Sequence, residues 1–144
     1  MKKLNEQSTK IFSRLLKKLN GKDHIKLHSE GFMPLTIEKL DTNISTLSGK
    51  ATTYSLTHYY EQNGDLMRDP EMVFIVVDNR TDGNDYTALE IYPQMYQQDN
   101  LGLFEQSIII ENNTIKSFIK TWQHSHCNFA NHWLKNINQQ GFLK

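Results

Sequence analysis

Hydrophobic residues follow a helical spacing near the start of the chain. Residues 5–19 place apolar side chains three or four positions apart, with basic side chains on the opposite side. This pattern predicts an amphipathic helix, for which Ser8 is a candidate N-cap. Asn20 and Gly21 tolerate left-handed backbone and are expected to end it. The apolar stripe consists of Ile11, Leu15, Leu16 and Leu19.

The middle of the chain changes to the alternation and composition of β-strands. We expect strands at 23–29, 34–40, 51–60, 72–77, 86–92 and 103–110, with loops at 43–49 and 94–102. The run from Met72 to Val77 is apolar at every position, which is typical of a central strand buried on both faces. Turn residues at 62–65 and 81–84 separate neighbouring strands, and Pro93 is expected to end one, because proline cannot donate to a ladder.

Helical spacing returns near the end, from Ile115 to Ile137. Asn113 or Thr114 is the expected cap, and Gly141 the expected stop. Trp122, Phe129 and Trp133 are expected to be buried against residues 72–77. The prediction is a single α+β domain over residues 1–144. It contains an antiparallel sheet of about five or six strands, an N-terminal amphipathic helix and a long C-terminal helix on one face.

Composition places the chain among ordinary globular domains. It has 144 residues, of which 38% are hydrophobic and 22% charged, and a net charge of zero. Its single cysteine, Cys127, cannot form an internal disulfide, and its first residues lack the apolar core of a signal peptide. With no apolar run of 18 residues, we expect a cytoplasmic protein that does not enter the membrane. The neutral balance disfavours direct nucleic-acid binding.

The charges are unevenly distributed along the chain. Residues 1–26 carry a net charge of +6, residues 57–111 carry −9, and residues 112–144 contain four lysines and no acidic residue. Two interpretations remain open. Basic helices that pack beside an acidic sheet would largely cancel its field, whereas an exposed acidic face would serve a function.

Four potential metal ligands lie on the predicted C-terminal helix, at His124, His126, Cys127 and His132. Their angular spread around a helix keeps them from converging as a zinc site requires. We therefore expect no metal here and interpret His126 as a hydrogen-bonded core histidine.

The densest polar stretch, residues 58–72, forms the candidate site. One interpretation is a group of carboxylates beside a histidine that binds a divalent cation or shares a proton. The other is a structured turn, in which Asp65 and Asp69 accept hydrogen bonds from free amides and Arg68 bridges two carboxylates. The candidate residues are His58, Tyr60, Asp65, Arg68, Asp69 and Glu71, joined by Tyr96 and Asp99 from a later loop.

The same stretch resembles a family of small uncharacterised bacterial domains carried on plasmids, conjugative elements and phage-related islands. The resemblance rests on His58–Met72 (HYYEQNGDLMRDPEM), Tyr96–Gly102 (YQQDNLG) and Phe129–Phe142 (FANHWLKNINQQGF). It implies a compact α+β domain in a mobile-element context and assigns no catalytic residue. On this basis residues 22–144 form the family-like core, and the basic helix of residues 1–21 is interpreted as a local addition.

Three functions remain open at this point. The first is a non-enzymatic accessory protein of a mobile genetic element that binds another protein. The second is an acidic-surface inhibitor of a host defence nuclease or another nucleic-acid-binding protein. The third is a metal-assisted hydrolase built on Asp65, Asp69, Glu71 and Asp99. No cofactor is expected, and the oligomeric state is left open.

Overall fold

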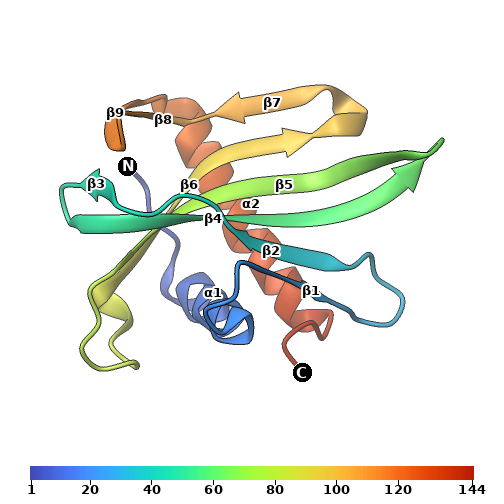
Figure 1. Cartoon of the computed structure of the whole chain (residues 1–144), viewed down its shortest axis with the longest axis horizontal. Coiled ribbons are helices and arrows are strands. Elements are labelled where there is room, and N and C mark those ends of the chain that lie inside the picture. The colour runs from blue at the N-terminus through green and yellow to red at the C-terminus, as the bar shows by residue number, and fades with distance from the viewer.

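The computed structural model describes all residues 1–144 and places the strands in one strongly curved sheet with two helices (Figure 1). The helices are α1 (Glu6–Leu19) and α2 (Lys120–Gln139), and two short 3-10 turns, η1 (Tyr86–Ala88) and η2 (Asp99–Leu101), flank one strand. The strands are β1 (His24–Leu27), β2 (Leu35–Lys39), β3 (Ile44–Thr46), β4 (Gly49–Gln62), β5 (Asp65–Asp78), β6 (Leu89–Gln98), β7 (Leu103–Gln106), β8 (Ile108–Glu111) and β9 (Thr114–Phe118).

The sheet has nine strands rather than five or six, and it is mixed rather than antiparallel. Its main order is β7-β6-β5-β4-β3-β9-β8, with β2 paired to β4 and β1 paired to β2. The parallel pair is β3 with β9, at Ser45 and Thr114. The sheet curves so strongly that β7 and β8, the two ends of this order, come near each other. The sheet therefore forms a nearly closed barrel. The α+β class is confirmed.

Strand β5 lies between β4 and β6, as its apolar run predicts. Met72, Phe74 and Val76 belong to the large core between the sheet and both helices. The alternate residues Ile75 and Val77 belong to a smaller core at the closed end of the barrel. The run is apolar throughout because neither face of it meets water.

The predicted start of the C-terminal helix was wrong. Asn112 and Asn113 both adopt left-handed backbone, with φ of 52° and 58°, which suits a two-residue hairpin turn between β8 and β9. Residues 114–118 therefore form a strand, and α2 begins at Lys120.

The buried side of α2 also differs from the predicted stripe. Trp133 is buried as expected, with 6% of its surface exposed, whereas Trp122 and Phe129 are each 39% exposed. Buried Gln123 explains why α2 is rotated about its axis relative to the predicted stripe. Its side chain donates to the carbonyl of Lys2 and accepts from the amide of Lys2. Those bonds satisfy both ends of the amide and turn Gln123 inward in place of Trp122.

Two strands on the β6 side were also predicted with the wrong boundaries. Pro93 does not end β6, which continues to Gln98. Proline is tolerated there because the β5–β6 register shifts beside it and β7 pairs only from Met95 onward. The expected strand 103–110 is divided at Ser107, whose amide donates to the carbonyl of Gln94. The expected loop at 43–49 contains β3.

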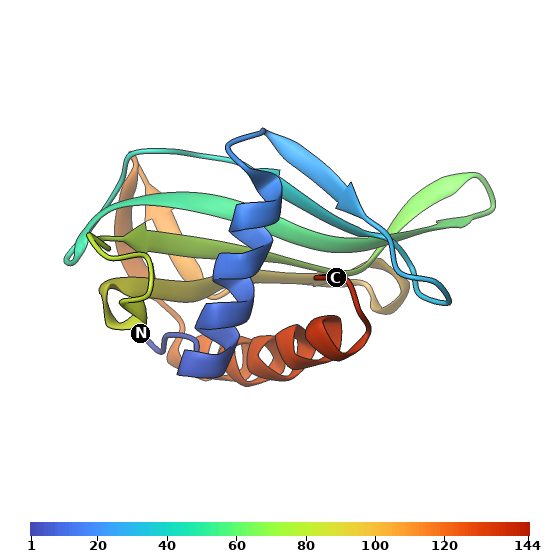
Figure 2. The ribbon, with the colours of Figure 1, turned by 90° about the horizontal axis from the view of Figure 1, so that it is seen from below.

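Helix α1 covers the same face of the sheet as α2 (Figure 2). Its cap is Asn5, whose side chain accepts from the amide of Ser8, so Ser8 is not the cap. Left-handed Asn20 ends the helix as predicted. No helix in the chain has both the length and the apolar character needed to cross a membrane.

Replacing Trp133 with alanine tests the packing of α2 on the sheet. We expect the variant to lose about 3–5 kcal/mol of unfolding free energy, the usual cost of removing a buried aromatic side chain. Trp122→Ala is the matched control on the same helix and should cost less, because its ring is 39% exposed. Chemical denaturation of both variants beside the wild type measures the difference, and equal losses would contradict the arrangement.

Candidate functional site

The sheet face opposite the two helices carries two rows of side chains across β4, β5, β6 and β7, which are buried on β4 and in the first row and become exposed at Phe104 and Gln106 of β7. Side chains that lie directly across neighbouring strands share a face. One row joins Ser55, Val73, Met95 and Gln106, and the next joins Thr57, Glu71, Gln97 and Phe104. A cavity of about 440 Å³ lies beside the first row, lined in part by Val73, Met95 and Gln106. We call this surface the open face.

Arg68 is the centre of a polar cluster on the open face. Its Nη1 donates to Oε1 of Gln97 at 2.8 Å and lies 3.8 Å from Oε1 of Glu71. Its Nε lies 3.3 Å from Oδ2 of Asp99, and the same oxygen accepts from the Arg68 amide at 2.8 Å. The predicted guanidinium bridge between two carboxylates is therefore present, with Glu71 and Asp99 as its partners.

Ser55 extends this cluster toward the middle of the sheet. Its hydroxyl is within 2.6 Å of Oε2 of Glu71 and 3.1 Å from Oγ1 of Thr57. Glu71 is thus hydrogen-bonded on one oxygen and ion-paired on the other, an arrangement that stabilises a carboxylate. Neither Ser55 nor Gln97 was among the predicted site residues. The alternating hydroxyl side chains at positions 53, 55 and 57 were the available sequence signal for this polar face.

The remaining acidic residues of the predicted turn have different roles from those expected. Asp65 is exposed beside the β4–β5 turn, and no hydrogen bond of its side chain is found. Asp69 accepts from the side-chain amide of Gln98 at 2.9 Å, a side-chain partner and not a free backbone amide. The amide-accepting role belongs to Asp99. Tyr60 lies opposite Met67 on β4, outside the Arg68 cluster.

No group of three or more histidine, cysteine, aspartate or glutamate side chains is placed to hold a metal ion. In the Arg68 cluster, the two carboxylates face a guanidinium. A cation at this point would have to displace the positive charge that already pairs with both of them.

His58 lies within the core and not on the open face. Its Nδ1 is 3.1 Å from the carbonyl oxygens of both Met33 and Pro34, so this nitrogen carries the proton and donates. The ring contacts Trp133 and Phe142, with centroid separations of 5.7 Å and 5.6 Å. Burial lowers the pKa of His58 below its ordinary value, although the two carbonyls and Asp69 act in the opposite direction. His58 is therefore a structural member of the predicted set.

His126 is the hydrogen-bonded core histidine that the sequence predicts. Its Nδ1 is 3.0 Å from Oγ of Ser107, and its Nε2 is 2.8 Å from Oε1 of Glu105. Tyr96 stacks on the imidazole at 5.7 Å. A hydroxyl, an imidazole and a carboxylate in this order resemble a hydrolase triad. Ser107, however, is fully buried and donates to the carbonyl of Gln94, so this group joins β7 and β8 to α2.

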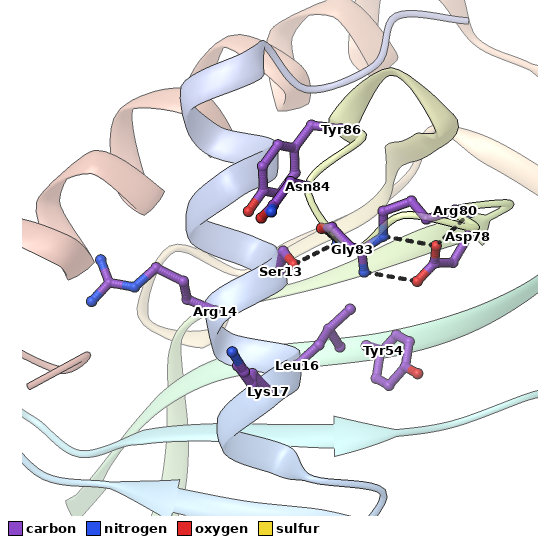
Figure 3. A pocket seen from close by; sticks show the side chains of 10 residues that line it. All are labelled: Ser13, Arg14, Leu16, Lys17, Tyr54, Asp78, Arg80, Gly83, Asn84 and Tyr86. Carbon is purple, nitrogen blue, oxygen red and sulfur yellow. Dashed lines mark hydrogen bonds and ion pairs between the residues drawn. The ribbon is translucent and has the colours of Figure 1, made fainter.

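A second cavity, of about 710 Å³, lies between α1 and the loop that follows β5 (Figure 3). Arg80 extends along it and pairs with Asp78 through Nε and Nη2, each at 2.9 Å. Its Nη1 donates to Ser13 on α1 and to the carbonyl of Gly83. The side-chain bond from Arg80 holds the pKa of Asp78 below its ordinary value. These bonds occupy most of the guanidinium donors, so Arg80 attaches the loop to the helix.

The acidic residues of 57–111 do not gather on one face. Asp78, Asp82 and Asp85 lie in or beside the loop next to basic α1, at one end of the molecule (Figure 1). The tips of the β4–β5 and β6–β7 hairpins lie at the opposite end. Residues 59–71 and 97–106, which form these tips, contain six acidic residues and one basic residue. We call this end the hairpin end.

Exchanging Asp99 for alanine tests the bridge between the two hairpins. The variant loses the acceptor of the Arg68 amide and one carboxylate partner of its side chain, so we expect a loss of about 1–3 kcal/mol of unfolding free energy. Asp65→Ala removes an equal charge from an exposed position and should stay within about 0.5 kcal/mol of the wild type. Urea denaturation of the two variants measures this contrast. Equal stability of Asp99→Ala and Asp65→Ala would contradict a structural role for the bridge between Asp99 and Arg68.

The lowered pKa of His58 predicts a pH dependence of stability. Well above pH about 6.5 the residue is neutral in both states, whereas as the pH falls through that value the unfolded chain gains a proton more readily than the folded chain. Stability should therefore fall as the pH drops from 7.5 to 5.5. His58→Asn keeps a donor near the two carbonyls and cannot titrate, so its stability should fall less over that range. Denaturant unfolding at both pH values measures the unfolding free energy of each protein. An equal fall in the wild type and in His58→Asn would exclude His58 as the source of the pH dependence.

Comparison with known proteins identifies the family of this fold. The family model described as "Domain of unknown function (DUF6908)" matches residues 10–143. No curated protein and no solved structure matches the chain. The match begins within α1, so this helix from Lys10 onward lies inside the family domain, whereas the sequence had suggested a core of residues 22–144. The chain belongs to the DUF6908 family of domains of unknown function.

Proposed function

We propose that this protein is a non-catalytic accessory domain of a mobile genetic element that acts by binding another protein through its open face. The observation that carries the proposal is the asymmetry of the sheet. Both helices pack on one face, while the other face borders a cavity and becomes exposed at Phe104 and Gln106 of β7. Exposed aromatic side chains such as Phe104 are enriched at protein interfaces, where they combine with polar groups.

Apolar side chains at the hairpin end supply the contact area. Phe104 is 57% exposed, Leu66 and Leu101 are each 60% exposed, and Leu103 is 39% exposed. Phe104 lies directly across from Gln97 of the Arg68 cluster, whose groups are already bonded to one another, whereas Leu103 lies across from Gln98 on the other face. Exposed apolar side chains gathered beside polar residues mark an interaction surface.

The polar groups give less support to catalysis. Glu71 and Asp99 are paired with Arg68, and the imidazole of His126 lies against buried Ser107. A general base or nucleophile needs a free lone pair that a substrate can reach. The mobile-element context rests on the sequence resemblance alone.

The nucleic-acid mimic has less support than protein binding in general. Such a mimic requires a regular row of negative charges on one surface, whereas nine of the eleven acidic residues of 57–111 divide between two ends of the molecule. At one end Arg80 pairs with Asp78, and at the other Arg68 pairs with Glu71 and Asp99.

Site-specific crosslinking tests the proposed function. A benzoylphenylalanine at position 104 should form a discrete crosslink to another protein in bacteria that carry the gene. The same probe in place of Gln7, an exposed residue of α1, should not give that product. Gels and mass spectrometry of the crosslinked species make the comparison. Identical products from both positions, or no product from position 104, would contradict a binding role for the open face.

A further inference from the structure

Strand β7 has one edge that no other strand of the chain covers. It pairs with β6 and with no other strand, and it is the outermost strand of its side of the sheet (Figure 1). The Ser107 amide points to Gln94 of β6, so along an alternating strand the amides of Glu105 and Leu103 point the same way. The amides and carbonyls of Phe104 and Gln106 therefore point outward.

This edge lacks the devices that normally protect an exposed strand. Lysine, proline or a covering helix usually prevents an edge from pairing with another chain. Strand β1, which ends the branch through β2, carries Lys26 and lies beside α1. The sequence of β7 is Leu-Phe-Glu-Gln, without lysine or proline, and its Phe104 side chain is 57% exposed.

The charge around β7 favours one kind of partner. The hairpin end carries six acidic residues and one basic residue, a net charge of −5. A second copy of this chain would bring the same negative charge against it, which disfavours self-pairing. Successive side chains of a strand point to opposite faces, so the apolar side chains of an alternating strand would meet Phe104 and its basic side chains would meet Glu105 on the other face.

We propose that β7 binds an extended segment of a partner protein as an added strand, in which apolar residues alternate with lysine or arginine. The segment pairs with the outward amides and carbonyls of Phe104 and Gln106 and extends the sheet by one strand. This inference rests on the proposed protein-binding function and specifies the chemistry of the partner.

Two synthetic peptides of about ten residues test the inference. One alternates valine with lysine, and the other alternates valine with glutamate. Amide hydrogen exchange by NMR follows the isotope-labelled protein with each peptide. We expect the lysine peptide to slow exchange at Phe104 and Gln106 about tenfold or more, and the glutamate peptide to leave it unchanged. Raising the salt concentration from about 50 mM to about 500 mM should weaken the effect.

A proline at position 106 provides the matched variant. Gln106→Pro removes an outward amide and leaves the amides that face β6, whereas Gln106→Thr keeps the backbone donor. The proline variant should lose most of the binding and the threonine variant should keep it. Spectra of the free variants show whether each is folded. If the proline variant is unfolded, the threonine variant tests the proposal instead. Slowed amide exchange with the lysine peptide and unchanged exchange with the glutamate peptide would support the added strand, and any other pattern would contradict it.

Three results would overturn the proposal. They are no slowing at Phe104 and Gln106 with the lysine peptide, equal slowing by both peptides, or protection of the same amides without peptide as the protein concentration rises. The last result would identify a second copy as the occupant. A position-104 crosslink that persists in Gln106→Pro would leave the proposed function standing and remove the added strand.

Discussion

Burial of both faces of β5 is the constraint on which the rest of the structure depends. From Met72 to Val77, alternate side chains enter two different cores, so the strand needs apolar layers above and below it. The helices supply one layer, and the curling of the sheet through β3, β9 and β8 supplies the other. The barrel is closed only along the part of β5 that this second layer covers.

The outer half of β5 faces a different environment because the covering layers end before it. From Asp65 to Glu71 the strand is polar and partly exposed, and the register with β4 shifts between Thr57 and Tyr59. Paired charges tolerate this partial exposure, and Leu66 in the same stretch is 60% exposed. The same long hairpin therefore joins a closed, apolar barrel end to an open, polar sheet end, which explains why the binding surface lies where it does.

The sequence predicts the elements whose environment is local or uniform. The apolar run of β5, the amphipathic stripe of α1 and the turn at Asn63-Gly64 depend on neighbours along the chain. The errors occur where a distant contact decides. Gln123 turns inward because the backbone of Lys2 satisfies it, and Pro93 remains in β6 because β7 leaves it unpaired. No periodicity in the sequence contains those contacts.

The same distinction between local and distant contacts explains which parts of the candidate site could be predicted from the sequence. Arg68 is predicted to bridge carboxylates because it is the one basic residue in an acidic stretch, and Coulomb attraction favours that pairing. Which carboxylates it meets depends on the register of β5 against β6, which brings Asp99 and Gln97 to it and leaves Asp65 in solvent. His58 shares the motif with Arg68 but lies beside Trp133 in the core. The motif thus combines a packing role and a surface role.

The Arg68 cluster also determines how the hairpin end behaves as a surface. Asp99 lies beyond the end of β6, so its bonds to the amide and side chain of Arg68 tie the β6–β7 turn to β5. That tie adds a restraint between the two hairpin tips beyond the β5–β6 ladder, so a partner has less to order on binding. Holding them together in the free protein lowers that entropic cost and gives Phe104 and the free edge of β7 a fixed position. A side-chain pair of modest strength can therefore contribute more to binding through preorganisation than through any direct contact with the partner.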